Sequence, residues 1–132
     1  MDVKIVLGAK DGKSYQKELK DAAADALHNK RIGDTVSGEE IGFPGYEFLI
    51  TGGSDKCGFP MRKGIQDARK KVMIGKSVGF SGSDRNDKKQ KGLMKKITVC
   101  GERVTKIIHQ VNLKVVKEGP QPLAGEATEQ KQ

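Results

Sequence analysis

The sequence lacks tryptophan and is poor in aromatic residues, which make up 5% of its 132 residues. This scarcity argues against a large aromatic core and against a rich surface for stacking nucleic-acid bases. The two cysteines, Cys57 and Cys100, lie far apart without a Cys-x-x-Cys spacing, so neither a disulfide scaffold nor a zinc knuckle is expected. No apolar stretch approaches the roughly 20 residues that cross a bilayer, and the N-terminus shows no secretion signal. We therefore expect a soluble, intracellular protein.

Large apolar residues are also scarce, which limits the core that the chain can build. Leu, Ile, Val and Phe account for 30 of the 132 residues, slightly more than the fraction of roughly 20% below which disorder is expected. Glycine, in contrast, is abundant, with 17 residues, so the chain should turn often. The length fits a single domain with a thin core.

Positive charge is abundant but unevenly distributed along the chain. The formal net charge is +8, yet residues 1–61 carry 8 basic and 10 acidic side chains, whereas residues 62–114 carry 15 basic and 4 acidic ones. All of the positive excess therefore comes from the second segment. Such a concentration indicates a surface that binds a polyanion, the alternative being a solvated face without a partner.

Short runs of β-branched and aromatic residues, bounded by glycine, predict a mainly β fold. The expected strands cover residues 3–7, 14–19, 46–51, 69–74, 97–100 and 111–117, and residues 35–42 are expected to form a turn and a short strand. One short helix is expected over residues 22–29, capped by Asp21, and a helical turn over residues 104–110. Frequent turns between short strands favour a small closed or partly open β-barrel of about six strands, within a single domain of residues 1–120.

Three segments have a composition that argues against regular secondary structure. Residues 52–60 are predicted to form a glycine-rich loop. Residues 75–92 are expected to belong to an irregular, basic, glycine-rich arm at about 75–103, ordered only if something holds it. Residues 121–132 are predicted to form a disordered tail, because they consist mainly of Gln, Ala, Glu, Pro and Thr.

The segment Gly8–Ser14 follows a predicted strand and is similar to a phosphate-binding P-loop, which would suit a nucleotide-binding enzyme or regulator. A P-loop needs four residues between its glycines, whereas three separate Gly8 from Gly12. The pair Asp11-Gly12 is typical of a hairpin turn instead. A second glycine run, Gly52–Asp55, could also hold a phosphate or a metal, so the enzyme alternative stays open at this point.

Chemically reactive side chains are present but have no partners at a useful spacing. His28 and His109 lack Cys, Asp or Glu residues at catalytic or ligand spacing. Cys57 lies beside Lys56, but no base with an orienting partner accompanies it. We therefore predict no catalytic residue, no metal and no cofactor.

The strongest functional signal is a series of cations interleaved with glycines. Flexible backbone lets cationic side chains follow the irregular phosphate path of a folded RNA, whereas duplex DNA is more often read by a basic helix, which is not expected here. Since aromatic residues are few, contacts should be mainly to phosphate and sugar groups. The predicted RNA-binding residues are Arg62, Lys63, Arg69, Lys70, Lys71, Lys76, Arg85, Lys88, Lys89, Lys91, Lys95, Lys96 and Arg103.

Residues 50–62 read ITGGSDKCGFPMR, and this run closely resembles the hallmark of the archaeal and eukaryotic small-subunit ribosomal protein family S6e. Other segments resemble the family in the same order along the chain, namely Gly42–Tyr46, Arg69–Val72 and Gln110–Val115. The resemblance covers about residues 1–120. Because the long run is rich in unusual residues, chance is a poor explanation.

The resemblance implies a small β-barrel that binds ribosomal RNA (rRNA) as a structural constituent of the small ribosomal subunit, without catalysis. It implies rRNA and neighbouring ribosomal proteins as partners in the cytoplasm, no membrane and no small-molecule substrate, and a monomer off the ribosome. The chain is similar to the short archaeal form, for which regulation by phosphorylation of a C-terminal helix is not expected. A rigid structural loop is expected from Gly52, Gly53, Asp55, Gly58, Phe59 and Pro60.

Overall fold

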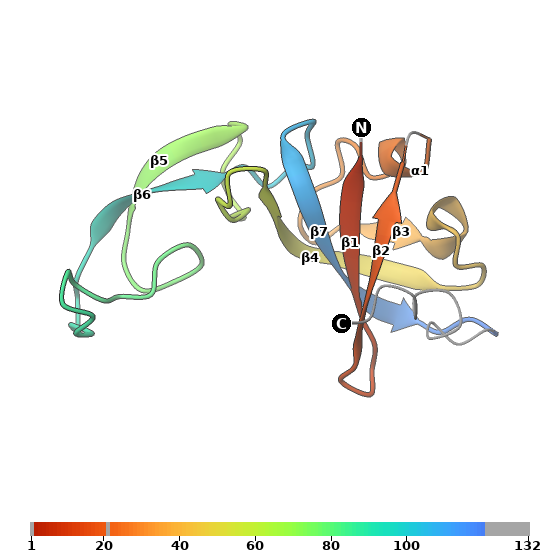
Figure 1. Ribbon diagram of the computed structural model, residues 1–132, viewed down its shortest axis with the longest axis horizontal. Coiled ribbons are helices and arrows are strands. Elements are labelled where there is room, and N and C mark those ends of the chain that lie inside the picture. The colour runs from red at the N-terminus through yellow and green to blue at the C-terminus, as the bar shows by residue number, and fades with distance from the viewer. Residues whose placement is uncertain (1, 21, 121–132) are drawn as a thin grey trace.

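The computed structural model describes residues 2–20 and 22–120 (Figure 1). The predicted tail at 121–132 and the predicted helix cap, Asp21, lie outside these residues. No helix in the two described ranges is long and apolar enough to span a membrane. In chain order the elements are β1 (Val3–Gly8), β2 (Ser14–Leu19), α1 (Ala22–Asp25), β3 (Thr35–Ser37), the 3-10 helix η1 (Gly38–Ile41), β4 (Glu47–Asp55), β5 (Arg69–Ile74), β6 (Lys95–Cys100) and β7 (Ile108–Lys117).

Five of the strands form one mixed sheet in the order β2-β1-β7-β4-β3. Strands β1 and β7 run parallel, and the other neighbours are antiparallel. Alternate residues of β1 point into the core, so Val3, Ile5 and Leu7 are fully buried. Buried residues of α1 and η1 join the same core. The helix α1 ends at Asp25 and is therefore shorter than the helix predicted over residues 22–29.

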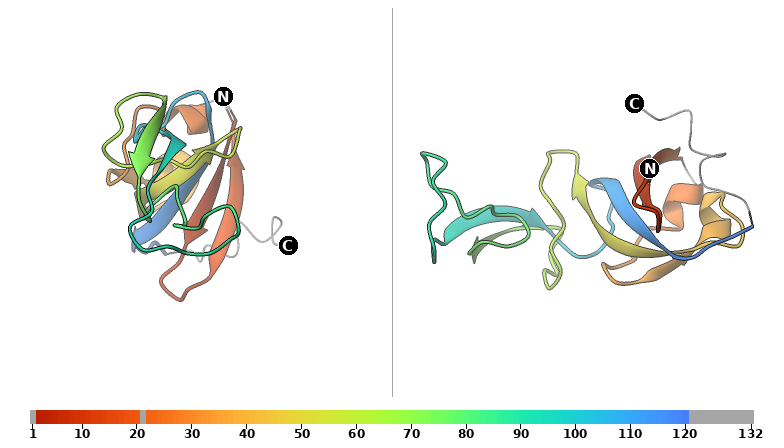
Figure 2. Two further views of the ribbon diagram at one scale, coloured as in Figure 1. Left: turned by 90° about the vertical axis from the view of Figure 1, so that its left-hand side faces the viewer. Right: turned by 90° about the horizontal axis from the view of Figure 1, so that it is seen from below.

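The remaining strands, β5 and β6, pair antiparallel with each other and form a two-stranded ribbon. This ribbon projects from one end of the five-stranded sheet and makes the molecule elongated (Figures 1 and 2). The segment that connects the two strands, residues 75–94, continues to the far end of the molecule. The predicted basic arm thus belongs to a part of the chain that stands away from the main sheet.

The prediction of a mainly β fold is confirmed, but the predicted barrel is not. The seven strands of the described residues form a sheet and a separate two-stranded ribbon rather than one barrel. The physical reason is visible in β5, where the consecutive residues Arg69, Lys70 and Lys71 are all exposed. Successive side chains of a strand point to opposite faces, so the first half of β5 has cations on both faces and cannot line the apolar core of a barrel.

The predicted helical turn over residues 104–110 is wrong, because β7 begins within it at Ile108. The backbone of Val104 is paired with a distant segment. Its amide donates to the Lys30 carbonyl at 2.8 Å, and its carbonyl accepts from the Asn29 amide at 2.9 Å. The spacing of the apolar residues in this segment suits a helix. The backbone groups that a helix would need are instead hydrogen-bonded to the distant segment, so no helical turn forms.

The predicted glycine loop at residues 52–60 is also wrong in its first half, because β4 continues to Asp55. Gly53 lies so close to β7 that a Cβ atom on it would come within 2.3 Å of the carbonyl oxygen of Gln110. Glycine at this point therefore marks the close approach of two strands. A register shift in the same part of β4, typical of a β-bulge, accompanies the glycines.

Candidate nucleic-acid interface

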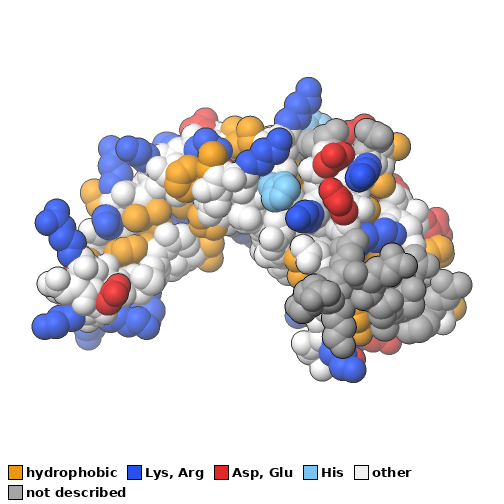
Figure 3. All heavy atoms as spheres, viewed as in Figure 1, with side chains coloured by type: hydrophobic (Ala, Val, Ile, Leu, Met, Phe, Trp, Pro, Cys, Tyr) orange, Lys and Arg blue, Asp and Glu red, His pale blue; other side chains and the backbone are white. Residues whose placement is uncertain are grey.

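The projecting part of the molecule gathers the cations that the sequence singles out. We use the name basic ribbon for residues 62–103, which comprise β5, β6 and their flanking and connecting segments. The basic ribbon holds all thirteen predicted RNA-binding residues and only four acidic ones. Figure 3 shows Lys and Arg side chains over the projecting part, whereas most of the visible Asp and Glu side chains lie over the five-stranded sheet. Lys and Arg occur over the sheet as well, so it is the net positive charge that is concentrated on the projection.

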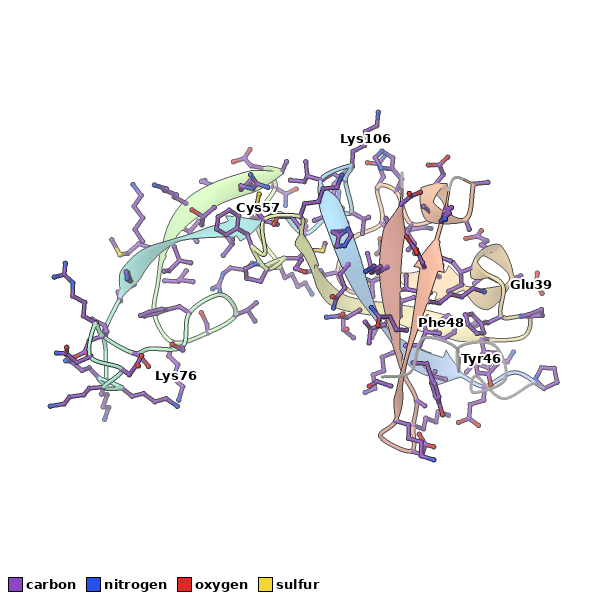
Figure 4. All side chains as sticks on the ribbon, in the orientation of Figure 1. Glu39, Tyr46, Phe48, Cys57, Lys76 and Lys106 are labelled. Atoms are coloured by element: carbon purple, nitrogen blue, oxygen red, sulfur yellow. The ribbon has the colours of Figure 1, made fainter. Side chains whose placement is uncertain are left out.

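Asp55, at the end of β4, joins the basic ribbon to the sheet. Its side chain is fully buried, and its Oδ1 atom accepts hydrogen bonds from the amides of Cys57 and Phe59, each at 2.9 Å. Its Oδ2 atom accepts from the guanidinium of Arg69, through Nε at 2.9 Å and through Nη2, and from the Cys100 thiol at 3.0 Å. Cys57, labelled in Figure 4, marks this junction. One carboxylate therefore ties together β4, the turn after it, the start of β5 and the end of β6.

The surroundings of Asp55 favour its ionised form. Burial raises the pKa of its carboxyl group, but the hydrogen bonds from Cys100, Phe59 and Arg69, together with the charge of Arg69, outweigh burial and hold the pKa below its ordinary value. The hydrogen bond to Asp55 in turn raises the pKa of Arg69. Burial, reinforced by the neighbouring carboxylate, raises the pKa of the Cys100 thiol to about 12. This thiol therefore stays protonated and acts as a hydrogen-bond donor.

A second carboxylate, Glu102, holds the segment that leads from the sheet to β5. Its oxygens accept hydrogen bonds from the Gly64 amide at 3.1 Å and from Gln66 Nε2 at 2.9 Å. These bonds, that from Gly64 foremost, lower the pKa of Glu102, with the charge of Arg31 at 4.0 Å as a weaker contribution. The carbonyl of Glu102 also accepts from the Ile32 amide at 3.0 Å. Two buried carboxylates thus fix the base of the basic ribbon.

Two of the predicted RNA-binding arginines contact protein groups. Arg69 is paired with the junction carboxylate, and its guanidinium carbon lies 5.2 Å from the centre of the Phe59 ring. Arg62 donates from Nη1 to the Ser77 hydroxyl at 2.9 Å and to the Val78 carbonyl at 2.8 Å. Both arginines therefore brace the basic ribbon from within.

The other eleven predicted cations form no ion pair with any described residue. Within residues 2–20 and 22–120, the ion pairs are those of Arg69 with Asp55 and of Arg31 with Glu102. Ten of the eleven side chains are exposed, so their charge acts on the surrounding solvent. The eleventh, Arg103, is half-buried, and its charge also helps to lower the pKa of Glu102. The eleven cations are Lys63, Lys70, Lys71, Lys76, Arg85, Lys88, Lys89, Lys91, Lys95, Lys96 and Arg103.

Asp84, which the sequence reasoning missed, organises the lysine-bearing loop in the connecting segment. Its Oδ1 atom accepts from the amides of Asn86 at 2.9 Å and Lys88 at 3.0 Å, and its Oδ2 atom accepts from Gln90 Nε2 at 2.7 Å. These bonds, that from Lys88 foremost, lower the pKa of Asp84. The side chain of an Asp that accepts from an amide two residues on is an Asx turn, and this turn signal could have identified the residue.

Lys76, labelled in Figure 4, lies on the basic ribbon at the opposite end of the molecule from Glu39. Its stem packs beside Gly82, where an added Cβ atom would come within 3.1 Å of the Lys76 Cβ. Gly82 has a φ of +82°, a conformation that favours glycine. The connecting segment therefore folds back on itself and holds the stem of Lys76 while the ammonium group stays exposed.

Comparison with known proteins adds evidence beyond the geometry. The family model of ribosomal protein S6e matches residues 3–128. The chain belongs to the ribosomal protein S6e family. It is 42% identical over 123 residues to the small ribosomal subunit protein eS6 of Methanococcus maripaludis, with 92% of each chain covered. It is 40% identical over 126 residues to the protein of the same name from Archaeoglobus fulgidus, with 93% of each chain covered. It is 36% identical over 120 residues to that of Thermoplasma acidophilum, with 90% of this chain and 91% of the relative covered.

Membership of the S6e family confirms the resemblance carried by residues 50–62. In the structure this signature covers the end of β4 and the turn after it, where it builds the Asp55 junction. Of the six predicted structural-loop residues, three lie in β4, namely Gly52, Gly53 and Asp55. The other three lie in the turn after it, namely Gly58, Phe59 and Pro60. The family signature therefore surrounds the base of the basic ribbon.

The predicted hairpin at Gly8–Ser14 is confirmed as the turn between β1 and β2. The Ala9 amide donates to the Lys13 carbonyl at 2.8 Å, and the Asp11 carboxylate accepts from the Lys13 amide at 3.1 Å. Gly12 has a φ of +90°, as such a turn requires. The turn leads into strand β2, whereas a P-loop leads into a helix. The segment Gly8–Ser14 is therefore not a P-loop and does not support the nucleotide-binding alternative.

Proposed function

We propose that the chain is a structural component of the small ribosomal subunit and that the basic ribbon binds rRNA, chiefly through phosphate and sugar groups. The observation that carries this proposal is the set of eleven ribbon cations without an ion-pair partner among the described residues. The S6e family assignment, with relatives named as small-subunit proteins, supports the ribosome as the setting. The role is structural and includes no catalytic step.

The shape of the basic ribbon fits a folded RNA better than duplex DNA. Its cations lie on two strands and an irregular segment, and the α-helix that the described residues contain is only four residues long. Such a helix is too short to read a major groove. Cations on a projecting ribbon reach phosphates on several sides, as the irregular backbone of a folded RNA demands.

In this proposal, residues 1–120 act as one rRNA-binding unit. The five-stranded sheet is the platform, and the carboxylates of Asp55 and Glu102 hold the basic ribbon at a fixed position on it. The partners are rRNA and neighbouring ribosomal proteins in the cytoplasmic ribosome. The free protein is a monomer, and no small-molecule substrate, cofactor or membrane takes part.

Sedimentation of a cell lysate in moderate salt tests the proposal. The protein should travel with small ribosomal subunits, and a protein that stays at the top of the gradient would contradict the proposed role. Replacing Lys88 and Lys89 together by Glu should release it from the subunits, because both side chains are exposed on the basic ribbon. The matched control replaces Lys10 and Lys13 by Glu on the β1–β2 hairpin, which changes the net charge equally and should leave sedimentation unchanged.

A further inference from the structure

The basic ribbon carries exposed apolar side chains as well as cations. Of four highly exposed large apolar residues in the described chain, three lie in the basic ribbon: Met73, Val78 and Met94, at 60%, 59% and 57% exposure. Figure 3 shows hydrophobic side chains between Lys and Arg side chains on this projection. Val78 lies in the connecting segment, whereas the two methionines belong to the paired part of the ribbon. Single exposed apolar residues are common on proteins, but two on one face of a narrow ribbon form a patch that a partner can cover.

Met73 and Met94 lie on the same face of the basic ribbon. Met73 stands directly opposite Lys96, and Lys71 precedes Met73 by two residues in β5. Side chains two residues apart in a strand share a face, as do directly opposed ones. Met94 precedes Lys96 by two residues, and its Cγ lies 3.9 Å from the position that a Cβ atom on Gly75 would take. The face therefore consists of two methionines, the bare backbone of Gly75 and two lysines.

The opposite face of the basic ribbon is covered by its own connecting segment. Ile74 and Val99 point to that side and are buried. Gly79 packs over them, since a Cβ atom on it would come within 2.9 Å of Val99 Cγ1 and 3.5 Å of Ile74 Cδ1. On the other face, by contrast, the apolar side chains of Met73 and Met94 remain exposed.

We propose that this open face, formed by Met73, Gly75 and Met94 and flanked by Lys71 and Lys96, binds an unpaired nucleobase of the rRNA. The inference rests on the proposed function and adds a base contact to the phosphate contacts described above. The polarisable sulfur of methionine packs favourably against aromatic rings. Gly75 leaves a flat floor beside Met94, and the two lysines are placed to neutralise the phosphates that flank the base.

Charge and geometry favour RNA as the occupant. No Asp or Glu occurs between residues 68 and 83 or between residues 88 and 101, so every charged residue of the two strands that form the face is positive. Such a surface attracts a polyanion rather than a neutral apolar segment of protein. Within an RNA helix the base faces are hidden by stacking, whereas an unpaired nucleotide presents its ring to protein side chains.

The double variant Met73→Ser with Met94→Ser removes both thioethers without changing the charge. Its affinity for transcribed small-subunit rRNA of the same organism is compared with that of the unaltered protein at several salt concentrations by filter binding. We expect a Kd about tenfold higher at every salt concentration and an unchanged slope of affinity against salt, because a base contact releases no counterions. The matched control, Val116→Ser, removes an exposed apolar side chain of the sheet and should bind normally.

A second variant separates the base contact from the phosphate contacts. Replacing Lys71 and Lys96 by Gln should make the log–log salt slope shallower by about 1.4 to 1.8, as expected for two lost phosphate contacts. Ultraviolet crosslinking of the complex should also attach a nucleotide to a peptide that contains Met73 or Met94.

The outcomes distinguish this inference from the proposed function. If the unaltered protein fails to bind rRNA, the proposed function fails. If it binds and the methionine variant binds equally well, only the base contact is overturned. Equal rRNA affinity combined with loss of the methionine variant from assembled subunits would assign the open face to a protein neighbour, and this result also overturns the inference.

Discussion

Replacing Asp55 by asparagine tests how the basic ribbon is attached to the sheet. An asparagine keeps one carbonyl oxygen, which can still accept from the amides of Cys57 and Phe59. Its amide nitrogen, however, would face the donors of Arg69 and Cys100 in place of a carboxylate oxygen. Hydrogen bonds to charged groups contribute about 1.5–3 kcal/mol each. Because the Arg69 side chain is 37% exposed, solvent screens part of the ion pair.

We therefore expect Asp55→Asn to lower the free energy of unfolding by about 2–3 kcal/mol. For a domain of this size, the corresponding fall in Tm is about 6–15 °C, measurable by circular dichroism. The matched control is Asp67→Asn, which neutralises an exposed carboxylate in the same ribbon and should change Tm by no more than about 2 °C. A Tm of the Asp55 variant equal to that of this control would refute the role assigned to the junction.

Asp84→Ala should speed amide hydrogen exchange at Asn86 and Lys88, because it removes the acceptor of both amides. It should also weaken rRNA binding several-fold with little change in Tm, since it frees the loop but exposes no core. Unchanged hydrogen exchange would contradict this role of Asp84. Gly53→Ala should lower the urea midpoint sharply, because the added Cβ atom would collide with the carbonyl oxygen of Gln110. Gly52→Ala should lower the midpoint far less, because the space beside Gly52 is open. Equal effects of the two substitutions would contradict the close approach of the strands at Gly53. The pKa values of Asp55, Asp84 and Glu102 are lowered in the folded protein, so the unfolded chain binds protons first as the pH falls. The stabilisation from these carboxylates should therefore be complete above the ordinary pKa values of 3.8 for Asp and 4.5 for Glu and decrease below them. An unchanged urea midpoint at about pH 2.5 would argue against this.

Local patterns predicted several strands, and the predicted range 69–74 agrees with β5 at both ends. The hairpin of Asp11-Gly12 delimits two strands, and the predicted range 14–19 agrees with β2. The pairing of β1 with β7 was not predictable, because it joins residues about a hundred positions apart. Local patterns say which residues suit a strand but not which distant strand will lie beside it.

The location of the charge was predictable, but the use of individual cations was not. Counting charges along the sequence is enough to find the basic ribbon. That Arg69 neutralises a buried Asp55, and that Arg62 braces the connecting segment, depends on tertiary contacts between separate parts of the chain. The same holds for Asp55 itself, which reads as a polar loop residue in the sequence and is a buried carboxylate in the structure.

The salt dependence of rRNA affinity tests most directly whether the exposed cations of the basic ribbon hold phosphates. The measurement is the Kd of the intact protein for small-subunit rRNA across a series of salt concentrations. If about ten phosphates are engaged, the log–log slope should lie at about −7 to −9. Replacing Lys88 and Lys89 by Gln should make it shallower by about 1.4 to 1.8. A slope near zero for the unaltered protein, or one unchanged in this variant, would contradict the assignment of the basic ribbon as the RNA-binding surface.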